Sequence, residues 1–322
     1  DDTVTFQTPK FGFLLPQNAL YVGEWHVVDI GLSKTFLKQT QTKYFLTNLK
    51  SIRRLIKPRN QFNHKGNFGH ALLIAGSTGK IGTAVLAARA ALRDGVGLLT
   101  VHIPAKGNVI LQSSVPEAMT TQDQDDDFFS GREIESFYTA VGIGPGLSQS
   151  PTTLSGFEYV LNQSVKPIVL DADALNMLAS SPLLMSKVPA GSILTPHPGE
   201  FKRLVGEWSN DFDKLEKLKA LATTLTSVIV LKGANSAIAM PDGSIHFNST
   251  GNPGMATGGS GDVITGILTA LLAQGYSTID ASLLGVYVHG LAGDLAAREI
   301  GETSLITGDL VDYLPAAFKK LI

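Results

Sequence analysis

The chain has 322 residues, of which 43% are hydrophobic, and a formal net charge of −2 at pH 7. This length suits one large α/β domain with an appendage, or two small domains, and the apolar fraction is ample for a buried core. The small net charge argues against a general nucleic-acid or membrane-surface binder. Cysteine is absent, which excludes disulfides, thiolate metal sites and a cysteine nucleophile. No run of about 18 apolar residues suggests a membrane span, and the acidic, polar first residues are unlike a signal peptide.

Residues 1–34 alternate short apolar runs with turns, which predicts strands at 3–6, 13–15 and 25–30. Strands this short need a larger sheet to join, so the segment is not expected to be a self-contained unit. Residues 35–62 form a polar, basic connector with a predicted helix at 49–55 that stops before Pro58.

From Asn63 onward the pattern becomes that of a strand–loop–helix–strand unit. A strand is predicted at 71–75, a glycine-rich loop at 76–82, an Ala-rich helix at 83–93 and a strand at 98–103. Further apolar runs predict strands at 139–143, 167–171, 192–195 and 228–231. Such continuous runs with polar residues at their C-terminal ends are typical of parallel strands covered on both faces.

The remaining elements complete an α/β fold. We expect the acidic run 123–127 to be a solvated loop rather than a metal cage. The segments 236–240 and 244–247 flank a Pro-Asp-Gly turn and predict a hairpin, and a helix is predicted at 281–298. The sequence therefore predicts a doubly wound, mostly parallel sheet with helices on both faces and a small antiparallel edge.

The stretch 252–266, NPGMATGGSGDVITG, holds five glycines and leads into an apolar run that predicts a buried helix starting near Asp262. Glycine amides at a helix N-terminus form an anion site. A carboxylate in that first turn repels phosphate but can accept a proton from a hydroxyl that attacks phosphorus. An isolated Gly-Asp more often caps a helix, but the run of small residues here favours catalysis. No Gly-Lys-Ser/Thr follows, so the stretch is not a Walker motif.

This stretch resembles the anion-hole and catalytic-base motif of the ribokinase-like superfamily. The ordered segments KGNFGHALLIAGSTGKIGTAVLAARAALRDGVGL, GIGPGL, VLDADALN, LTPHPGEF, VLKGAN and NPGMATGGSGDVITG are similar to one branch of it, the ADP- or ATP-dependent (S)-NAD(P)H-hydrate dehydratases. The resemblance runs from about residue 63 to the end of the chain, and LTPHPGEF and GGSGD at this spacing are specific. It implies a ribokinase-like fold and a repair lyase that phosphorylates the hydrate hydroxyl with ADP or ATP and eliminates phosphate to restore NAD(P)H.

The resemblance also implies roles for residues at the strand ends. Asp262 is expected to act as the base, and His197 to contact the hydrated dinucleotide together with Gly146 and Thr83. Thr83 is the less secure of these, because the family has Pro-Gly-Ala where this chain has Ile81-Gly82-Thr83. The expected anion hole consists of Gly259, Ser260 and Gly261, and the expected nucleotide contacts are Lys232, Gly233, Ala234, Asn235, Ser236 and Gly261.

The expected cofactor is Mg²⁺, organised with its waters by Asn176 and Glu200, since magnesium often keeps waters between itself and the protein. The expected partners are the hydrated dinucleotide and an adenine nucleotide, in a cytoplasmic homotetramer that binds neither nucleic acid nor membrane. Two alternatives stay open: a small-molecule kinase of the same fold acting on a vitamin or hydroxymethyl compound, and a nucleotide-binding regulator without turnover.

The first residues resemble a second family. The stretch TVTFQTPKFGFLLPQNALYVGEWHVVDIGL is similar to the closing strands of the YjeF N-terminal domain, an NAD(P)H-hydrate epimerase. We therefore expect residues 1–34 to be the C-terminal part of such a domain, 35–62 a linker with a helix, and 63–322 the dehydratase domain. On this division, removal of 1–34 is expected to spare dehydration.

Overall fold

The structure is a computed structural model that describes residues 2–322. Its main sheet has ten strands in the order β3-β12-β11-β10-β9-β8-β7-β4-β5-β6. The strands are β3 (Tyr44–Leu46), β4 (His70–Ile74), β5 (Leu98–Ile103), β6 (Met119–Gln122), β7 (Ala140–Ile143), β8 (Ile168–Leu170), β9 (Ile193–Leu194), β10 (Val228–Leu231), β11 (Ala237–Ala239) and β12 (Ile245–Phe247).

The strands from β10 to β6 run parallel to one another, and only β11 pairs antiparallel with its two neighbours. The order changes direction at β4, where β5 and β6 lie on one side and β7 to β10 on the other. This is the predicted doubly wound sheet with an antiparallel hairpin, and it places the carboxyl ends of seven parallel strands at one edge.

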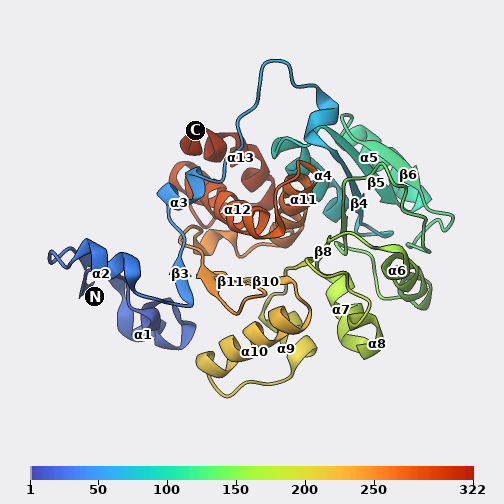
Figure 1. Ribbon diagram of the computed structural model, residues 1–322. Coiled ribbons are helices and arrows are strands. Elements are labelled where there is room, and N and C mark those ends of the chain that lie inside the picture. The colour runs from blue at the N-terminus through green and yellow to red at the C-terminus, as the bar shows by residue number, and fades with distance from the viewer. Residues whose placement is uncertain (1) are drawn as a thin grey trace.

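Helices cover both faces of this sheet (Figure 1). One face carries α3 (Leu49–Arg53), α4 (Ile81–Arg93), α5 (Asn108–Ser114), α11 (Ser260–Ala273), α12 (Thr278–Ile300) and α13 (Thr307–Leu321). The other carries α6 (Pro151–Gln163), α7 (Asp173–Ser180), α8 (Pro182–Met185), α9 (Pro198–Val205) and α10 (Asp211–Thr224). Because strands such as Val228–Leu231 are buried along their whole length, both faces need apolar cover, and their sequences are continuously apolar.

Helix α11 is the most buried helix of the fold. It packs against α4, α12 and the strand β7, and from Asp262 to Leu271 every residue is buried. Gly266 allows this close approach, because a Cβ there would lie 2.1 Å from the backbone oxygen of Ala87 on α4. The helix therefore holds its first turn rigidly at the edge of the sheet.

The N-terminal segment forms a separate two-stranded parallel sheet, β1 (Asp2–Phe6) and β2 (Glu24–Val28), with α1 (Ala19–Val22) and α2 (Lys34–Gln39) beside it. It lies beyond the β3 end of the main sheet (Figure 1). The predicted strand at 13–15 is wrong: residues Phe11–Leu14 form a short 3-10 helix. The turn lets the consecutive Leu14 and Leu15 both reach the main core, which an extended strand with alternating side chains would prevent.

Two more expectations need correction. The connector 35–62 contains its predicted helix, α3, but it also supplies β3, which pairs with β12 at the edge of the main sheet. Strand β3 was not predicted because its three residues are too few to show an alternation of apolar and polar side chains. The acidic run is also not fully solvated: Asp123 is buried and bonds through its carboxylate to the His102 ring (3.0 Å) and the Ser130 amide (2.9 Å).

Candidate functional site

The carboxyl ends of the central strands lie side by side. The amide of Asp171 donates to the Ile143 oxygen (3.2 Å), that of Thr195 to the Leu170 oxygen (3.1 Å) and that of Lys232 to the Pro196 oxygen (2.9 Å). These bonds continue the parallel pairing just beyond β7, β8, β9 and β10. The polar residues that follow each strand are thereby brought to one crevice, the usual ligand position in open α/β sheets.

The predicted glycine-rich loop ends at this crevice as the N-terminus of α11. Gly259 precedes the helix with φ of +93°, a left-handed conformation that glycine adopts without strain. The Thr307 hydroxyl donates to the Gly258 oxygen (2.7 Å), and the His289 ring bonds to the Ser260 oxygen at 3.0 Å. Gly259, Ser260 and Gly261 thus begin a buried helix, and the Ser260 amide donates to the Thr257 oxygen at 3.4 Å. First-turn amides and the helix dipole favour a bound anion at such a helix start.

Asp171 and Lys232 form a buried ion pair beneath that helix start. The Lys232 Nζ lies 2.7 Å from Asp171 Oδ1, and the Thr265 hydroxyl donates to Asp171 Oδ2 at 2.8 Å. A Cβ on Gly261 would lie 3.2 Å from Lys232 Nζ and 3.5 Å from Asp171 Oδ2. The first turn of α11 therefore sits directly on the ends of β8 and β10.

Asp262 is buried in the same first turn, with 9% of its surface exposed. Burial, followed by the Asp171 carboxylate, raises the pKa of this carboxyl to about 7, although the Lys232 cation acts in the opposite direction. A carboxyl with a pKa near 7 changes between its acid and base forms at neutral pH, which is what efficient general-base catalysis requires.

His197 and Glu200 cap α9 at the neighbouring strand end. The His197 Nδ1 accepts the Gly199 amide (3.0 Å), and Glu200 Oε2 accepts the His197 amide (2.8 Å), so each orders the other. Burial raises the pKa of Glu200 and lowers that of His197, and the Lys232 cation lowers the His197 pKa further. Half of the His197 side chain remains exposed to the crevice side, whereas Glu200 is buried with an oxygen 4.0 Å from Lys232 Nζ.

Asn176 lies next to this pair but is engaged elsewhere. Its Oδ1 accepts from the Arg203 guanidinium at 2.7 Å, and its Nδ2 lies 3.5 Å from Asp173. Glu200 and Asp171 also direct oxygens to protein donors. The Asp171 and Glu200 carboxylate oxygens near Lys232, and the Asn176 amide oxygen on Arg203, are hard donors of the kind that Mg²⁺ prefers. Since these oxygens already have protein partners, the residues fit a magnesium ion held through its waters and phosphate oxygens.

Thr83 and Gly146 meet at the β4 and β7 ends of the crevice. A Cβ on Gly146, whose φ is +63°, would lie 2.3 Å from the Thr83 Oγ1. The Thr83 hydroxyl donates to the Lys80 oxygen (2.8 Å), and the Gly146 oxygen accepts from Ser77 (2.7 Å). The structure therefore brings together these two residues, Thr83 from the first turn of α4 and Gly146 from the loop after β7.

Residues 232–236 form the turn between β10 and β11. The Gly233 amide donates to the Ser236 hydroxyl at 3.3 Å, while Gly233 and Ala234 are exposed. Asn235 Nδ2 donates to the Leu14 oxygen at 3.4 Å, which links this turn to the N-terminal segment. Only Lys232 of the five points into the buried charge network.

Three residues of the site had no assigned role from the sequence: Asp171, Thr265 and His289. Asp171 ends a predicted strand, so the sequence predicted its place at a strand end but not its ion pair with Lys232. Thr265 and His289 lie inside helices, four and twenty-nine residues beyond Gly261 and Ser260, and only the tertiary fold brings them to the anion site.

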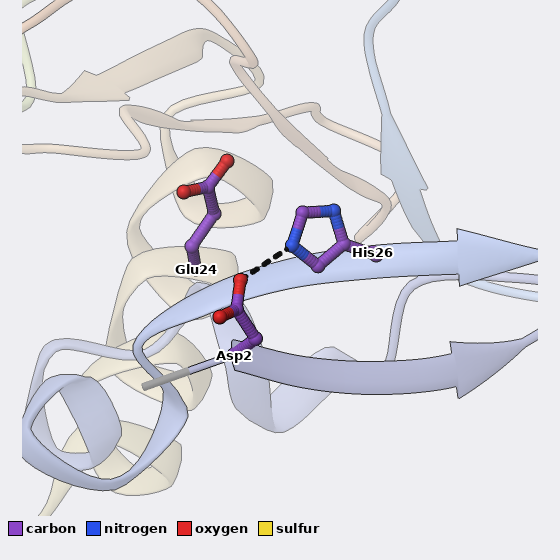
Figure 2. A group of neighbouring side chains, drawn as sticks. All are labelled: Asp2, Glu24 and His26. Carbon is purple, nitrogen blue, oxygen red and sulfur yellow. Dashed lines mark hydrogen bonds and ion pairs between the residues drawn. The ribbon is translucent and has the colours of Figure 1, made fainter.

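A second group of possible metal ligands lies far from this crevice, on β1 and β2 (Figure 2). Asp2, Glu24 and His26 are exposed, and the His26 ring lies 2.8 Å from Asp2 Oδ1. Exposed acidic groups are common without an ion, so we assign no metal to them. Among residues 2–322, no three such groups with closely spaced ligand atoms occur at the main crevice.

Comparison with known proteins places this crevice in a family. The sequence model of the NAD(P)H-hydrate dehydratase family matches residues 71–316. The bifunctional NAD(P)H-hydrate repair enzyme Nnr of Moorella thermoacetica is 38% identical over 99% of this chain, and the chain spans 62% of that relative's length. The ADP-dependent (S)-NAD(P)H-hydrate dehydratase of Bacillus subtilis is 36% identical over 84% of this chain and 96% of its own.

Solved structures agree with these matches. The crystal structure of ADP/ATP-dependent NAD(P)H-hydrate dehydratase from Bacillus subtilis, co-crystallised with ATP/Mg²⁺, has a TM-score of 0.76 and 34% identity, covering 85% of this chain and 98% of that one. A hydroxyethylthiazole kinase from Pyrococcus horikoshii, with a TM-score of 0.55 and 15% identity, shares the fold alone. The predicted ribokinase-like fold is confirmed. Among residues 2–322, no helix is both long and apolar enough to cross a membrane.

Proposed function

Because the chain belongs to the NAD(P)H-hydrate dehydratase family, we propose that it is a lyase that uses ADP or ATP to convert (S)-NAD(P)H hydrate to NAD(P)H. The observation that carries this proposal is the buried Asp262, with a pKa of about 7, in the glycine-rich first turn of α11. A base and an anion site in one turn suit phosphoryl transfer to a hydroxyl.

In this proposal Asp262 accepts the proton of the hydrate hydroxyl as the hydroxyl oxygen bonds to the terminal phosphorus of the nucleotide. The P–O bond to the rest of the nucleotide breaks, and ADP leaves from ATP, or AMP from ADP. The amides of Gly259, Ser260 and Gly261 stabilise the phosphoryl oxygens, and Lys232 binds the phosphates from the β10 side. Phosphate then leaves with the C–O bonding electrons, and a proton lost from the neighbouring carbon restores the double bond. Bound Mg²⁺ neutralises phosphate charge; Glu200 and Asn176 orient the waters around it.

We propose that Gly146, Thr83 and His197 contact the hydrated dinucleotide and that Gly233 to Ser236 border the nucleotide. Gly146 and Thr83 meet at the β4 and β7 ends, and His197 follows β9 with half of its side chain exposed. The exposed backbone of Gly233 and Ala234 is free to approach a flat base. These contacts line the crevice on both sides of the Asp262 turn.

Asp262→Asn tests the mechanism. Loss of a general base lowers turnover about 10²–10⁴-fold, measured as NADH absorbance regenerated from the S hydrate with ADP and Mg²⁺. The variant should stay folded. Burial raises the pKa of Asp262 in the folded state above its value in the unfolded state. The free energy of unfolding of the wild type therefore falls as pH rises from about 4 to 7, because the buried carboxyl loses its proton. The asparagine variant has no such proton to lose and should not show this decrease. Turnover near the wild-type rate would contradict the assignment.

The product distinguishes the alternatives stated above. A kinase would leave a stable phosphoester and a regulator would leave the hydrate unchanged, whereas a dehydratase regenerates NADH and releases phosphate. The names of the related proteins do not favour either alternative.

We also propose that residues 1–34 belong to an epimerase-like domain, with 35–62 as connector and 63–322 as the dehydratase domain. Support comes from the bifunctional repair enzymes, which align over nearly the whole chain, residues 1–34 included. The apolar side chains on this segment include Val4, Phe6 and Tyr21, which are 61%, 57% and 84% exposed. Interconversion of R and S hydrates, assayed on this chain and on a longer one carrying a complete epimerase domain, tests this division: only the longer chain should epimerise.

We propose that the enzyme works as a homotetramer in the cytoplasm. A cysteine-free chain is compatible with a reducing compartment. Light scattering coupled to size-exclusion chromatography measures the mass of the assembly directly, and a monomer at micromolar concentration would contradict the proposed tetramer. Cell fractionation with an antibody against the chain tests the compartment.

A further inference from the structure

Helix α12 lies beside α11 and also contacts the glycine-rich loop that leads into it (Figure 1). Asp294 of this helix accepts the Gly251 amide and the Asn252 side-chain amide through its two carboxylate oxygens, each at 3.0 Å. The approach is close, because a Cβ on Gly293 would lie 2.3 Å from Met255 Sδ. The start of the loop is therefore fixed against α12.

His289 of the same helix reaches the end of the loop. Its Nε2 lies 3.0 Å from the Ser260 carbonyl oxygen and 3.3 Å from Ser260 Oγ. A carbonyl oxygen can only accept a hydrogen bond, so these partners assign a hydrogen to Nε2, which donates it there. A ring nitrogen that carries a hydrogen has no lone pair left to accept another. The Ser260 hydroxyl therefore accepts from His289 and cannot donate to it.

The hydrogen of the Ser260 hydroxyl is thus left for another acceptor. Within residues 2–322, the His289 ring is the one hydrogen-bond partner of Ser260 Oγ. Ser260 is the first residue of α11 and is only partly buried, so a ligand can reach it. Side chains on a helix tilt toward its N-terminus, the end from which the first-turn amides also project. The hydroxyl can therefore donate to the same anion as those amides.

We propose that the Ser260 hydroxyl donates a hydrogen bond to the transferring phosphoryl group, and that His289 is the positioning residue that holds it. This role rests on the proposed function. The charge of a transferring phosphoryl group is spread over three oxygens, and donors held in place beforehand stabilise it. The Ser260 amide already donates to the Thr257 oxygen at 3.4 Å, so the hydroxyl supplies a donor at a residue whose amide is engaged.

His289 does not serve as a cation for phosphate. Burial lowers the pKa of its ring to about 4, the bond to the Ser260 oxygen acts in the opposite direction, and the Lys232 cation lowers the pKa as well. The ring is therefore neutral at pH 7 and acts through its single N–H. Ser260 keeps its proton in this role, and Asp262 remains the base.

Ser260→Ala tests the proposal in the intact chain, because it removes the hydroxyl and keeps the backbone amide. In turnover of the S hydrate with ADP and Mg²⁺, kcat should fall about 10- to 100-fold, the usual effect of losing one hydrogen bond to a charged group. The KM values for ADP and for the hydrate should stay within about twofold, since the hydrogen bond is strongest in the transition state. Ser260→Thr, which keeps a hydroxyl, should recover most of the loss.

Two further comparisons separate positioning from general stability. His289→Leu removes the ring donor and should lower kcat at least as much as Ser260→Ala, whereas His289→Gln, whose side-chain amide can donate in its place, should lose less. The double variant Ser260→Ala/His289→Leu should be no slower than His289→Leu alone, because His289 acts through Ser260. As a control, Ser155→Ala removes an exposed hydroxyl of α6, which donates to the Pro151 oxygen (3.1 Å), and should leave kcat unchanged.

A wild-type kcat in Ser260→Ala overturns the proposal, and so does a Ser260→Thr variant as slow as Ser260→Ala. If His289→Leu does not fold, the two Ser260 variants decide the result. A wild type that regenerates no NADH contradicts the proposed reaction instead. Calorimetric titration of orthovanadate, a mimic of the transferring phosphoryl group, into the ADP-bound protein then tests the hydroxyl without turnover. Ser260→Ala should bind vanadate about tenfold more weakly than the wild type, and equal affinities would overturn the proposal.

Discussion

The Lys232 ammonium lies 2.7 Å from the buried carboxylate of Asp171, directly beneath the first turn of α11. The pair acts on Asp262 in opposite senses, because Asp171 raises its pKa and Lys232 lowers it. Burial is the largest cause of the raised Asp262 pKa, and this pair, which comes from the ends of β8 and β10, adjusts it further.

The first prediction concerns pH. If Asp262 is the base, turnover depends on its deprotonated form and should rise with pH through about 7. Asp171→Asn removes a negative charge beside it, so the midpoint of the kcat profile should move to lower pH. Asp173→Asn, which removes a weaker contributor, should move it less. Profiles of all three proteins between pH 5 and 9 check this, and a midpoint that Asp171→Asn leaves in place would show that Asp262 does not limit the rate.

The second prediction compares two adjacent glycines. Gly259 has a φ of +93°, and a Cβ there would lie 2.6 Å from Leu86 Cδ1, whereas a Cβ on Gly258 would meet nothing within 4 Å. Gly259→Ala should therefore displace the anion site, lower kcat at least about tenfold and reduce stability by about 1–3 kcal/mol. Gly258→Ala should stay within about 0.5 kcal/mol of the wild type. Equal effects of the two substitutions on kcat and thermal unfolding would refute a special geometry at Gly259.

The third prediction separates nucleotide from substrate binding. Lys232→Ala should raise the KM for ADP or ATP about tenfold, and the KM for hydrated NADH much less, because the proposed lysine contact is to phosphate. It should also lower stability, since it leaves the buried Asp171 carboxylate without its cation. Lys202→Ala, an exposed lysine of α9, is the control and should change neither constant. An unchanged nucleotide KM in folded Lys232→Ala would place this lysine outside the nucleotide site.

The fourth prediction revises the expectation that residues 1–34 can be removed without effect on dehydration. Leu15 is 3% exposed within the main core, and Gln17 exchanges hydrogen bonds of 2.8 and 2.9 Å with Asp211. Leu15→Ala should therefore cost about 2–4 kcal/mol of unfolding free energy. Leu20→Ala, at a residue 94% exposed, should cost less than about 0.5 kcal/mol. Urea unfolding of both variants is the measurement; equal midpoints would show that the segment only rests on the surface.

The sequence alone determined the layers of this fold and the place of the glycine-rich helix start. Runs such as 228–231 and 168–170 are apolar throughout because both faces of a central parallel strand are covered, so the strands and the polar residues that follow them could be predicted. The apolar spacing after Asp262 predicted the helix start, and the glycines before it predicted a turn that other residues rarely adopt, as the φ of Gly259 shows. The edge strand β3 and the turn at Phe11–Leu14 escaped prediction, since three or four residues carry too little periodicity and their conformation follows from what they pack against.

Only the tertiary structure decided which charges meet. Lys232 and Thr265 follow Asp171 in the chain by 61 and 94 residues. The fold nevertheless brings the lysine Nζ and the threonine hydroxyl to 2.7 and 2.8 Å from the Asp171 carboxylate oxygens. The elevated pKa of Asp262 depends on burial and on that neighbour, neither of which a local pattern contains. The burial of Asp94, the residue that ends α4, also depends on the tertiary structure, because in the sequence it is an ordinary polar residue after a predicted helix. Its carboxyl oxygens have no hydrogen-bond partner within residues 2–322, which follows from how the ends of α4, α11 and α13 and the loop after α3 enclose it, because burial is a property of the assembled chain.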